Sequence, residues 1–591
     1  MWTHELLFLF LIFVFARPIN AKIVSTVYGQ IEGFTYTTPS GPVTDIFLGI
    51  PFGKSRRFEK PRAVQPWSGV LCATKFSSSC YNTLLFTQIA ERVAYLSDDE
   101  VPTFKHYSED CLTLNVMAPS VPCERGYPVL VVVNGGAFEL SGAALTGYKT
   151  LSINFVTKGI ICVSVNYRFG PLGLSLSSIC ARHSFVSGYL SAENEKFPGN
   201  YGLWDRHLAL LFVRKVIRSF GGNPHEITVI GEGSVVSALS LSPHTNGIYI
   251  STVLPIAVLG LFKRAIAIGG SMFSQTNLGS NCRNDSDHLA NHFDCYSPTF
   301  CANLVNSAMG DFQRAVTETG FVNDRLDYLS GMRFVPRIDG DFFPESLENL
   351  IKKAPQIPTI AGVTQCESAM LNLFTLFEGN RRFVVPRHKQ SEYSKLQLIE
   401  LINSLDDSML RLELISFYAH RRTEGSERED ARFYLKLQAE LASDILFNIP
   451  IYYEATLKAS LGHPVYLYVE EFSTLPTSAI PINLTTYGNI KTYIYGTFLG
   501  GVYQFSDNNV RYQKNVLDGF ASFITTGVPS VSGKAWLPIT SQNKDRYMAF
   551  DVKSRMKDGF HKESVDFWFR RIFGQKQRFR NLNLLFPSIN L

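Results

Sequence analysis

The chain has 591 residues, of which 45% are hydrophobic and 18% charged, so it is a packed globular protein and not a disordered or coiled-coil one. Its formal net charge of +5 is scattered along the sequence, and it is too weak and unpatterned to indicate nucleic acid as a partner. The length suits several ordinary domains or one large α/β domain with insertions.

The first predicted element is an apolar segment at the N-terminus. Residues 6–16 are apolar, and Pro18 and the small residue Ala21 follow them, as in a signal peptide with its cleavage site. The apolar run is too short to cross a bilayer comfortably. We therefore predict a signal peptide over residues 1–21, a secreted chain and no membrane span.

Secretion determines how the cysteines are interpreted. The ten cysteines include no CxxC pair, so disulfides are favoured over metal ligands in an oxidising compartment. Cys162 lies in an apolar run and is predicted to stay a buried thiol. N-x-S/T triplets begin at Asn284 and Asn483 and predict glycosylation. We expect no metal and no cofactor.

Six runs rich in β-branched residues are typical of buried parallel strands. In chain order they cover residues 127–136, 159–168, 226–233, 264–271, 358–364 and 463–472. The segment between the second and third runs contains a predicted helix over 202–222, whose apolar residues fall roughly on one face. The alternation of strands and helices predicts an α/β fold with a mostly parallel central sheet.

No repeat or linker divides the sequence, so we predict one domain over residues 22–573 and a basic tail over 574–591. The basic cluster near the C-terminus is interpreted as solvated; it consists of Arg570, Arg571, Lys576, Arg578 and Arg580.

Three glycine turns follow predicted strands, at Gly135–Gly136, Gly231–Gly233 and Gly269–Gly270. Open parallel sheets bind their ligands at the carboxyl ends of the strands. The three turns together therefore predict a shared crevice at that edge.

A series of motifs runs in a fixed order along nearly the whole chain: FLGIPFG, RFEKP, PWSGV, EDCLTLNV, NYRFGPLGL, PGNYGLWDRHLALLFVRKVIRSFGGNP, LFKRAI, IDGDFFPES, AGVTQCES, YIYG and FASFITTGVPS. This series resembles the type-B carboxylesterase/cholinesterase family, from about residue 22 to residue 573. The resemblance implies the α/β-hydrolase fold and a Cys80–Cys111 disulfide. It also implies a second disulfide at Cys295, with Cys301 or Cys282 as partner, and a homodimer to which residues 564–573 contribute.

Ester hydrolysis on this scaffold requires a serine on a tight strand-to-helix elbow, a histidine base and an acid. In ITVIGEGSVV the resemblance places the serine position at Gly233. Centring the motif on Ser234 instead puts Glu232 and Val236 where the elbow needs glycines. A second alignment has Ser-Ala-Gly deleted after Glu232, which restores both the motif and its spacing to SLSP. Neither alignment provides a properly placed serine.

The base position aligns with Tyr487, counted back from YIYG, and a tyrosine of ordinary pKa near 10 is a poor general base. The acid is retained as Glu367, for which we predict bonds to neighbours such as the Tyr487 hydroxyl. Gly135 and Gly136 occupy the oxyanion-hole positions. The nearest histidines, His463 and His561, lie outside the family's context.

Loss of the nucleophile or the base costs a serine hydrolase roughly six orders of magnitude in turnover. The sequence therefore predicts a non-catalytic relative, similar in this respect to neuroligin, neurotactin and glutactin, that binds a protein partner or a small hydrophobic ligand. The alternative is an active carboxylic ester hydrolase that uses Ser234, or a sequence altered by a splicing error. Residues 248–260 form an apolar stretch that the family lacks, either an insertion or translated intron.

Overall fold

The computed structural model describes most of the chain between Ala21 and Gly574. The described residues are 21–57, 59–81, 93–95, 107–135, 142–168, 200–246, 260–274, 292–294, 307–308, 311, 314–315, 336–372, 383–405, 409–421, 430–473, 484–486, 488–499 and 505–574.

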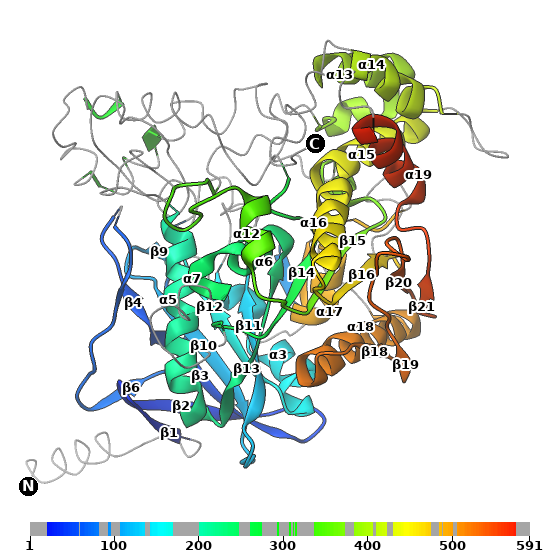
Figure 1. Ribbon diagram of the computed structural model, residues 1–591. Helices are drawn as coiled ribbons and strands as arrows, with labels where there is room; N and C mark the ends of the chain where they lie inside the picture. The colour runs from blue at the N-terminus through cyan, green and yellow to red at the C-terminus, as the bar shows by residue number, and fades with distance from the viewer. Residues whose placement is uncertain are drawn as a thin grey trace, which may run out of the picture.

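A mixed sheet, 13-stranded over the described residues, runs through the middle of the molecule (Figure 1). Its strands lie in the order β1 (Ala21–Thr26), β2 (Gly29–Thr37), β3 (Val43–Pro51), β10 (Thr113–Pro119), β12 (Ile161–Val165), β11 (Tyr127–Val133), β13 (Gly222–Glu232), β14 (Arg264–Ile268), β15 (Thr359–Thr364), β16 (Val465–Glu470), β20 (Tyr547–Phe550) and β21 (Arg555–Lys557), with β6 (Val70–Cys72) beside β2.

The six predicted strands are confirmed as β11 to β16, and all of them lie in the parallel part of the sheet. The first three strands and β10 pair antiparallel at one side of the sheet, and β21 does so at the other. The remaining pairs are β4 (Gly53–Lys54) with β5 (Arg62–Ala63), β7 (Ser79–Cys80) with β9 (Tyr107–Ser108), β8 (Val93–Tyr95) with β17 (Thr497–Leu499), and β18 (Ser530–Val531) with β19 (Lys534–Ala535).

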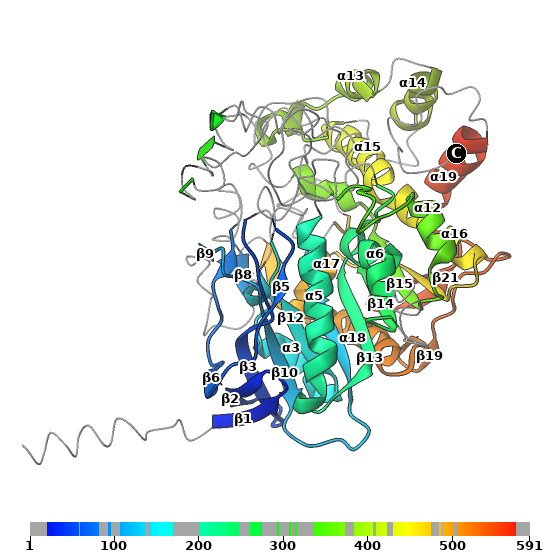
Figure 2. The ribbon, with the colours of Figure 1, turned by 60° about the vertical axis from the view of Figure 1, so that its left-hand side comes forward.

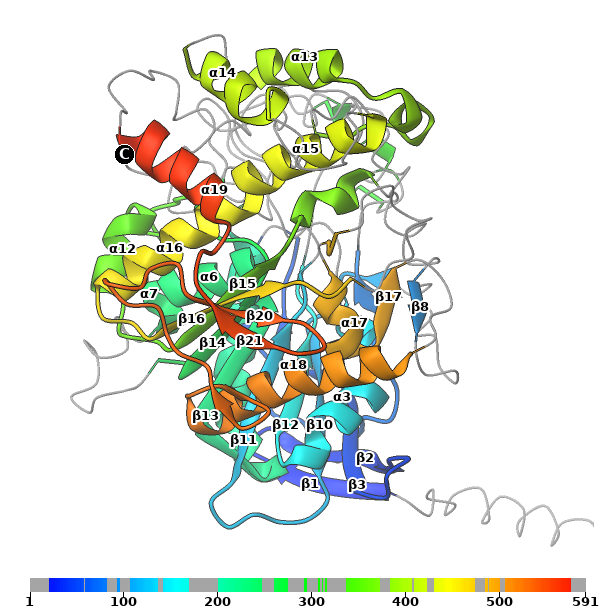
Figure 3. The same cartoon turned by 90° about the vertical axis from the view of Figure 1, so that its right-hand side faces the viewer.

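Helices cover both faces of the sheet, as Figures 2 and 3 show. One face carries α5 (Tyr201–Val216), α6 (Gly233–Leu241) and α16 (Ile449–Ser460), and the other carries α3 (Lys149–Asn154), α17 (Asn489–Tyr495) and α18 (Asp507–Thr526).

Strand β11 shows why its sequence is continuously apolar. Val129, Val131 and Val133 face the first set of helices, whereas Leu130 and Val132 face the second. Because successive side chains point to opposite faces, a strand covered on both faces needs apolar residues at every position. The predicted α/β fold with a mostly parallel sheet is confirmed.

The other helical segments lie around this core, and α13, α14 and α15 lie beyond the carboxyl edge of the sheet (Figures 1 and 3). They are η1 (Ala143–Thr146), η2 (Val156–Lys158), η4 (Ile217–Phe220), α7 (Pro243–Asn246), α12 (Leu347–Lys353), η6 (Glu367–Asn372), η8 (Arg387–Glu392), α13 (Lys395–Leu405), α14 (Met409–Leu414), η9 (Ile415–Ala419), α15 (Ala431–Ser443), η10 (Asp444–Asn448), α19 (Lys562–Val565) and η11 (Asp566–Ile572). Within the described part of the chain, no helix is both long and apolar enough to cross a membrane.

Two of the cysteine expectations are met. Cys80 and Cys111 form a disulfide, and Cys162 is a buried free thiol whose pKa is raised by burial. Cys295, its two candidate partners, the two glycosylation sites and residues 248–259 of the apolar stretch lie outside the described residues.

The segment 564–573 places its aromatic side chains inside the chain. The ring of Phe567 stacks on Phe417 with centroids 4.1 Å apart, and the buried Trp568 donates its indole N–H to the Tyr418 hydroxyl at 3.0 Å. Arg571 pairs with Glu413, and its side chain is still 53% exposed, as the solvated interpretation of this cluster expects. The homodimer stays a prediction.

Candidate functional site

The elbow region joins β13 to α6 without a separate turn residue. Glu232 has extended backbone angles, φ −61° and ψ 141°, and Gly233 is already the first residue of the helix. The Gly233 N–H donates to the carbonyl oxygen of Gly269 at 2.9 Å, so the glycine turns after β13 and β14 are in direct contact. Two of the three turns therefore meet, and the crevice expected between all three stays a prediction.

Gly233 is packed too tightly to carry a side chain. A Cβ at this position would lie 2.6 Å from the carbonyl carbon of Gly270 and 2.8 Å from the carbonyl oxygen of Gly269. Real Cβ atoms essentially never come this close to backbone atoms, so a serine here would force the two turns apart. Glycine at 233 follows from this close approach, because a residue without a Cβ lets two backbones touch.

Ser234 is the second residue of α6 and is 8% exposed. A nucleophilic serine needs a base within hydrogen-bond reach of its hydroxyl. Among the described residues, no histidine makes a hydrogen bond to Ser234. Tyr487, at the base position, lies outside the described residues.

Glu232 is held in a salt bridge by Lys491, and the two side chains are 6% and 20% exposed. Lys491 belongs to α17, four residues after position 487. The carboxyl group of Glu232 also packs against Gly135, where a Cβ would lie 2.6 Å from the carboxyl carbon. The carboxylate therefore fills the space beside the first predicted oxyanion-hole glycine; Gly136 lies outside the described residues.

Glu367, the predicted acid, is buried directly after β15. One carboxyl oxygen accepts the backbone N–H of Thr364 at 3.0 Å, and the other has no hydrogen-bond partner among the described residues. Burial raises its pKa to about 7, with a further increase from Glu232 and an opposing effect from Lys491. The predicted bond to Tyr487 is untested, since that residue is not described.

Glu470 is a second buried acid, which the sequence interpretation missed. It ends β16 and pairs in register with Thr364, at the neighbouring strand end. One carboxyl oxygen accepts hydrogen bonds from the Asn489 amide at 2.8 Å and the Tyr512 hydroxyl at 2.9 Å. Burial raises its pKa to about 8, and Glu367 adds to the increase. The available signal was a glutamate at the end of a predicted buried strand.

The two histidines nearest in sequence do not supply a base. His463 precedes β16 and so lies at the amino edge of the sheet, opposite the elbow. His561 is half-buried, and its electrostatic partners are Asp444, Glu471 and the backbone of Thr364. Burial lowers the pKa of both rings, that of His463 to about 4. Neither interacts with Ser234.

The buried acids predict an unusual dependence of stability on pH. Glutamate in the unfolded chain has an ordinary pKa of 4.5, whereas Glu367 titrates near 7 when folded. Between these values the folded state keeps a proton that the unfolded state releases, so the free energy of unfolding falls as the pH rises.

We therefore expect Glu367→Gln to gain stability relative to wild type between pH 5 and pH 8, by on the order of 2 kcal/mol. Urea denaturation across this range measures the difference, and Glu563→Gln, at an exposed side chain, is the matched control. Parallel stability profiles for Glu367→Gln and wild type would contradict the assignment.

In the part of the chain that the structure describes, no group of three or more His, Cys, Asp or Glu side chains is arranged to hold a metal ion. The site as described thus combines a glycine-walled strand-to-helix junction, a carboxylate–ammonium pair and two buried acids. Burial favours the protonated form of the two acids, whereas Glu232 and Lys491 form an ion pair.

Comparison with known proteins gives matches over almost the full length. A model of the carboxylesterase family matches residues 20–568. The chain is 29% identical to gut esterase 1 of Caenorhabditis briggsae, over 94% of this chain and 93% of that protein. It is 25% identical to carboxylesterase 1E of Mus musculus, over 93% of this chain and 94% of that protein. It is 28% identical to bile salt-activated lipase of Bos taurus, over 93% and 88%.

Proposed function

We propose that this chain, which belongs to the carboxylesterase family and has its α/β-hydrolase fold, is a secreted, non-catalytic member of the family. It acts by binding, with a protein partner or a small hydrophobic ligand as the bound species. Residues 22–573 form the binding domain in this proposal, after removal of residues 1–21 and before a basic tail over 574–591.

The observation that carries the proposal is the crowding at Gly233. Under the alignment that puts the family's nucleophile position at Gly233, a side chain there would collide with the backbone of Gly269 and Gly270. Under the alignment in which Ser-Ala-Gly is missing after Glu232, β13 passes directly into α6 and no residue stands at the nucleophile position.

The Glu232–Lys491 salt bridge supports the same conclusion. The segment that would carry the histidine base to the elbow places the Lys491 ammonium there, four residues after the base position. An ammonium paired with a carboxylate has no lone pair with which to accept a serine proton.

The second candidate is an active ester hydrolase that uses Ser234. The names of the relatives, which include esterases and a lipase, favour it. Ser234 also stands near the amino end of α6, where helix N–H groups favour a developing negative charge.

Steady-state hydrolysis of p-nitrophenyl butyrate separates the two candidates. We expect wild type and Ser234→Ala to hydrolyse the ester at the same rate, and no faster than a mock preparation does. The reason is that, among the described residues, no histidine bonds to the Ser234 hydroxyl. A wild-type rate about a hundredfold or more above that of Ser234→Ala would establish the second candidate.

A further inference from the structure

A cavity lies at the amino edge of the parallel sheet, opposite the elbow. It has a volume of about 520 Å³, within the range of small-molecule sites. Its walls come from the residues just before β14, β15 and β16, from the last part of α5 and from the residues that follow α18. None of the residues placed at the elbow lines it.

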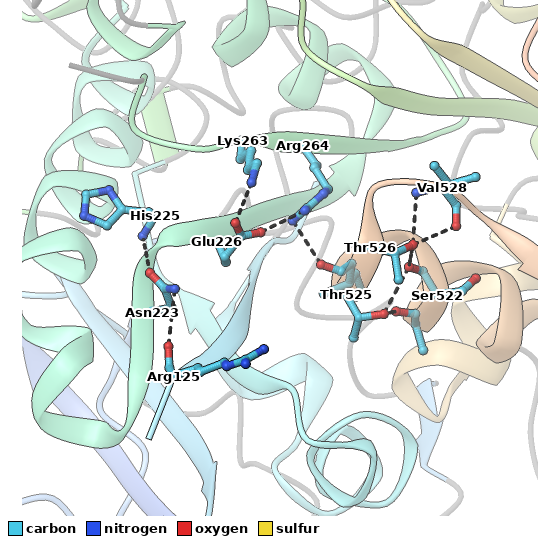
Figure 4. A network of polar contacts seen from close by, with 12 residues as sticks. Arg125, Asn223, His225, Glu226, Lys263, Arg264, Ser522, Thr525, Thr526 and Val528 are labelled. Atoms are coloured by element: carbon cyan, nitrogen blue, oxygen red, sulfur yellow. Dashed lines mark hydrogen bonds and ion pairs between the residues drawn. The ribbon is translucent and has the colours of Figure 1, made fainter. Parts of the chain in front are cut away.

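The cavity is lined by three cationic side chains, Arg214, Lys263 and Arg264. No carboxylate belongs to its lining, as far as the structure describes those residues. Glu226 lies beside the cavity and pairs with both Lys263 and Arg264, as Figure 4 shows. Because two cations share this one carboxylate, Glu226 does not neutralise both of them.

Arg264 and Arg214 have structural bonds that fix their positions. Arg264 is buried and donates to the carbonyl oxygen of Ile524 at 3.1 Å, near the end of α18. Arg214 is half-buried and donates to the carbonyl oxygen of Gly260. Lys263 is exposed, at the surface of the cavity. The cations are therefore held in place without a ligand, which reduces the entropy cost of binding one.

The rest of the lining is largely apolar and stiff. It includes four prolines, whose rings fix the backbone, and three larger apolar side chains. These residues are Pro224, Pro355, Pro358, Pro464, Phe262, Ile357 and Tyr466. A ligand that fits such a cavity has an apolar body and one acidic group.

We propose that this cavity binds a small organic anion with an apolar body, such as a medium-chain carboxylate, with Arg214 and Lys263 facing its acid group. The site is independent of the elbow, so it does not depend on whether the protein hydrolyses esters.

The probe is 8-anilinonaphthalene-1-sulfonate, followed by fluorescence titration of the full-length protein and displaced by octanoate or by 1-octanol. We expect octanoate to displace the probe at a concentration about tenfold lower than 1-octanol does, because only octanoate carries the charge that the cations attract.

The following variants test whether the probe binds in this cavity. Arg214→Gln with Lys263→Gln is expected to weaken probe binding about tenfold. Val528→Trp, at a 58% exposed residue of the lining, is expected to weaken it by taking up part of the space. Lys562→Gln removes an equivalent exposed charge, one paired with Asp566 on α19, and is expected to change nothing.

The proposal is overturned if wild type fails to bind the probe, or if 1-octanol displaces it as well as octanoate does. It is also overturned if the double variant and Val528→Trp, both folded by circular dichroism, bind as wild type does, because the probe then occupies another site.

Discussion

A variant with Ser-Ala-Gly inserted after Glu232 and with Tyr487→His is expected to hydrolyse p-nitrophenyl butyrate about 10³-fold faster than wild type or more. The insertion supplies the turn residue that the direct β13-to-α6 passage lacks, and the substitution supplies an imidazole base. Glu367 already lies buried at the carboxyl end of β15, where an acid can orient that base.

The matched control carries Ala-Ala-Gly in place of Ser-Ala-Gly with the same Tyr487→His substitution. It has the same chain length and the same new histidine, and it should stay at the wild-type rate. If the serine variant folds with a wild-type circular dichroism spectrum and melting temperature yet gains no activity over this control, the scaffold has lost more than its nucleophile and base.

Asp205→Ala is expected to lower the free energy of unfolding by about 3–5 kcal/mol, because it leaves an uncompensated buried charge. Asp205 is fully buried in α5 and accepts hydrogen bonds from the Arg168 guanidinium at 2.7 and 2.8 Å. It also accepts the Arg168 backbone N–H at 3.1 Å. The pair joins the chain after β12 to the helix that covers the sheet.

Urea denaturation measures this loss. The control is Asp518→Ala, which breaks the surface pair with Lys514 within α18 and is expected to change stability by about 0.5 kcal/mol or less. Equal losses in the two variants would show that the buried pair contributes no more than an exposed one.

The parallel part of the sheet was predictable because its strands are buried on both faces. A continuous apolar run such as that of β11 is typical of a strand that is covered on both faces. The antiparallel strands were harder to find. In β1, for example, intermediate and exposed residues alternate, and this leaves a weak pattern over six residues.

The candidate site was predictable in part. The glycine positions and Glu367 followed from the motifs, and the contact of Gly233 with Gly269 brings two of the three glycine turns together. The Glu232–Lys491 salt bridge was not predictable, because it joins residues 259 positions apart. The motifs fix the position of each residue in the sequence but not the contact between them, and only the folded chain brings α17 to the elbow.

The basic cavity was missed for a related reason. Arg214, Lys263 and Arg264 come from two separate segments, and each segment alone is an ordinary mixture of basic and apolar residues. The three cations come together only in the folded chain, at the amino ends of the strands.

The most direct test of the central claim is covalent labelling of purified wild-type protein, expressed from a transcript-verified clone, with a fluorophosphonate that reacts with activated serines. Intact-mass analysis should show no adduct on wild type, while the variant with inserted Ser-Ala-Gly and Tyr487→His gains one. An adduct on wild type that maps to Ser234 and disappears in Ser234→Ala would contradict the account and identify the protein as an active serine hydrolase.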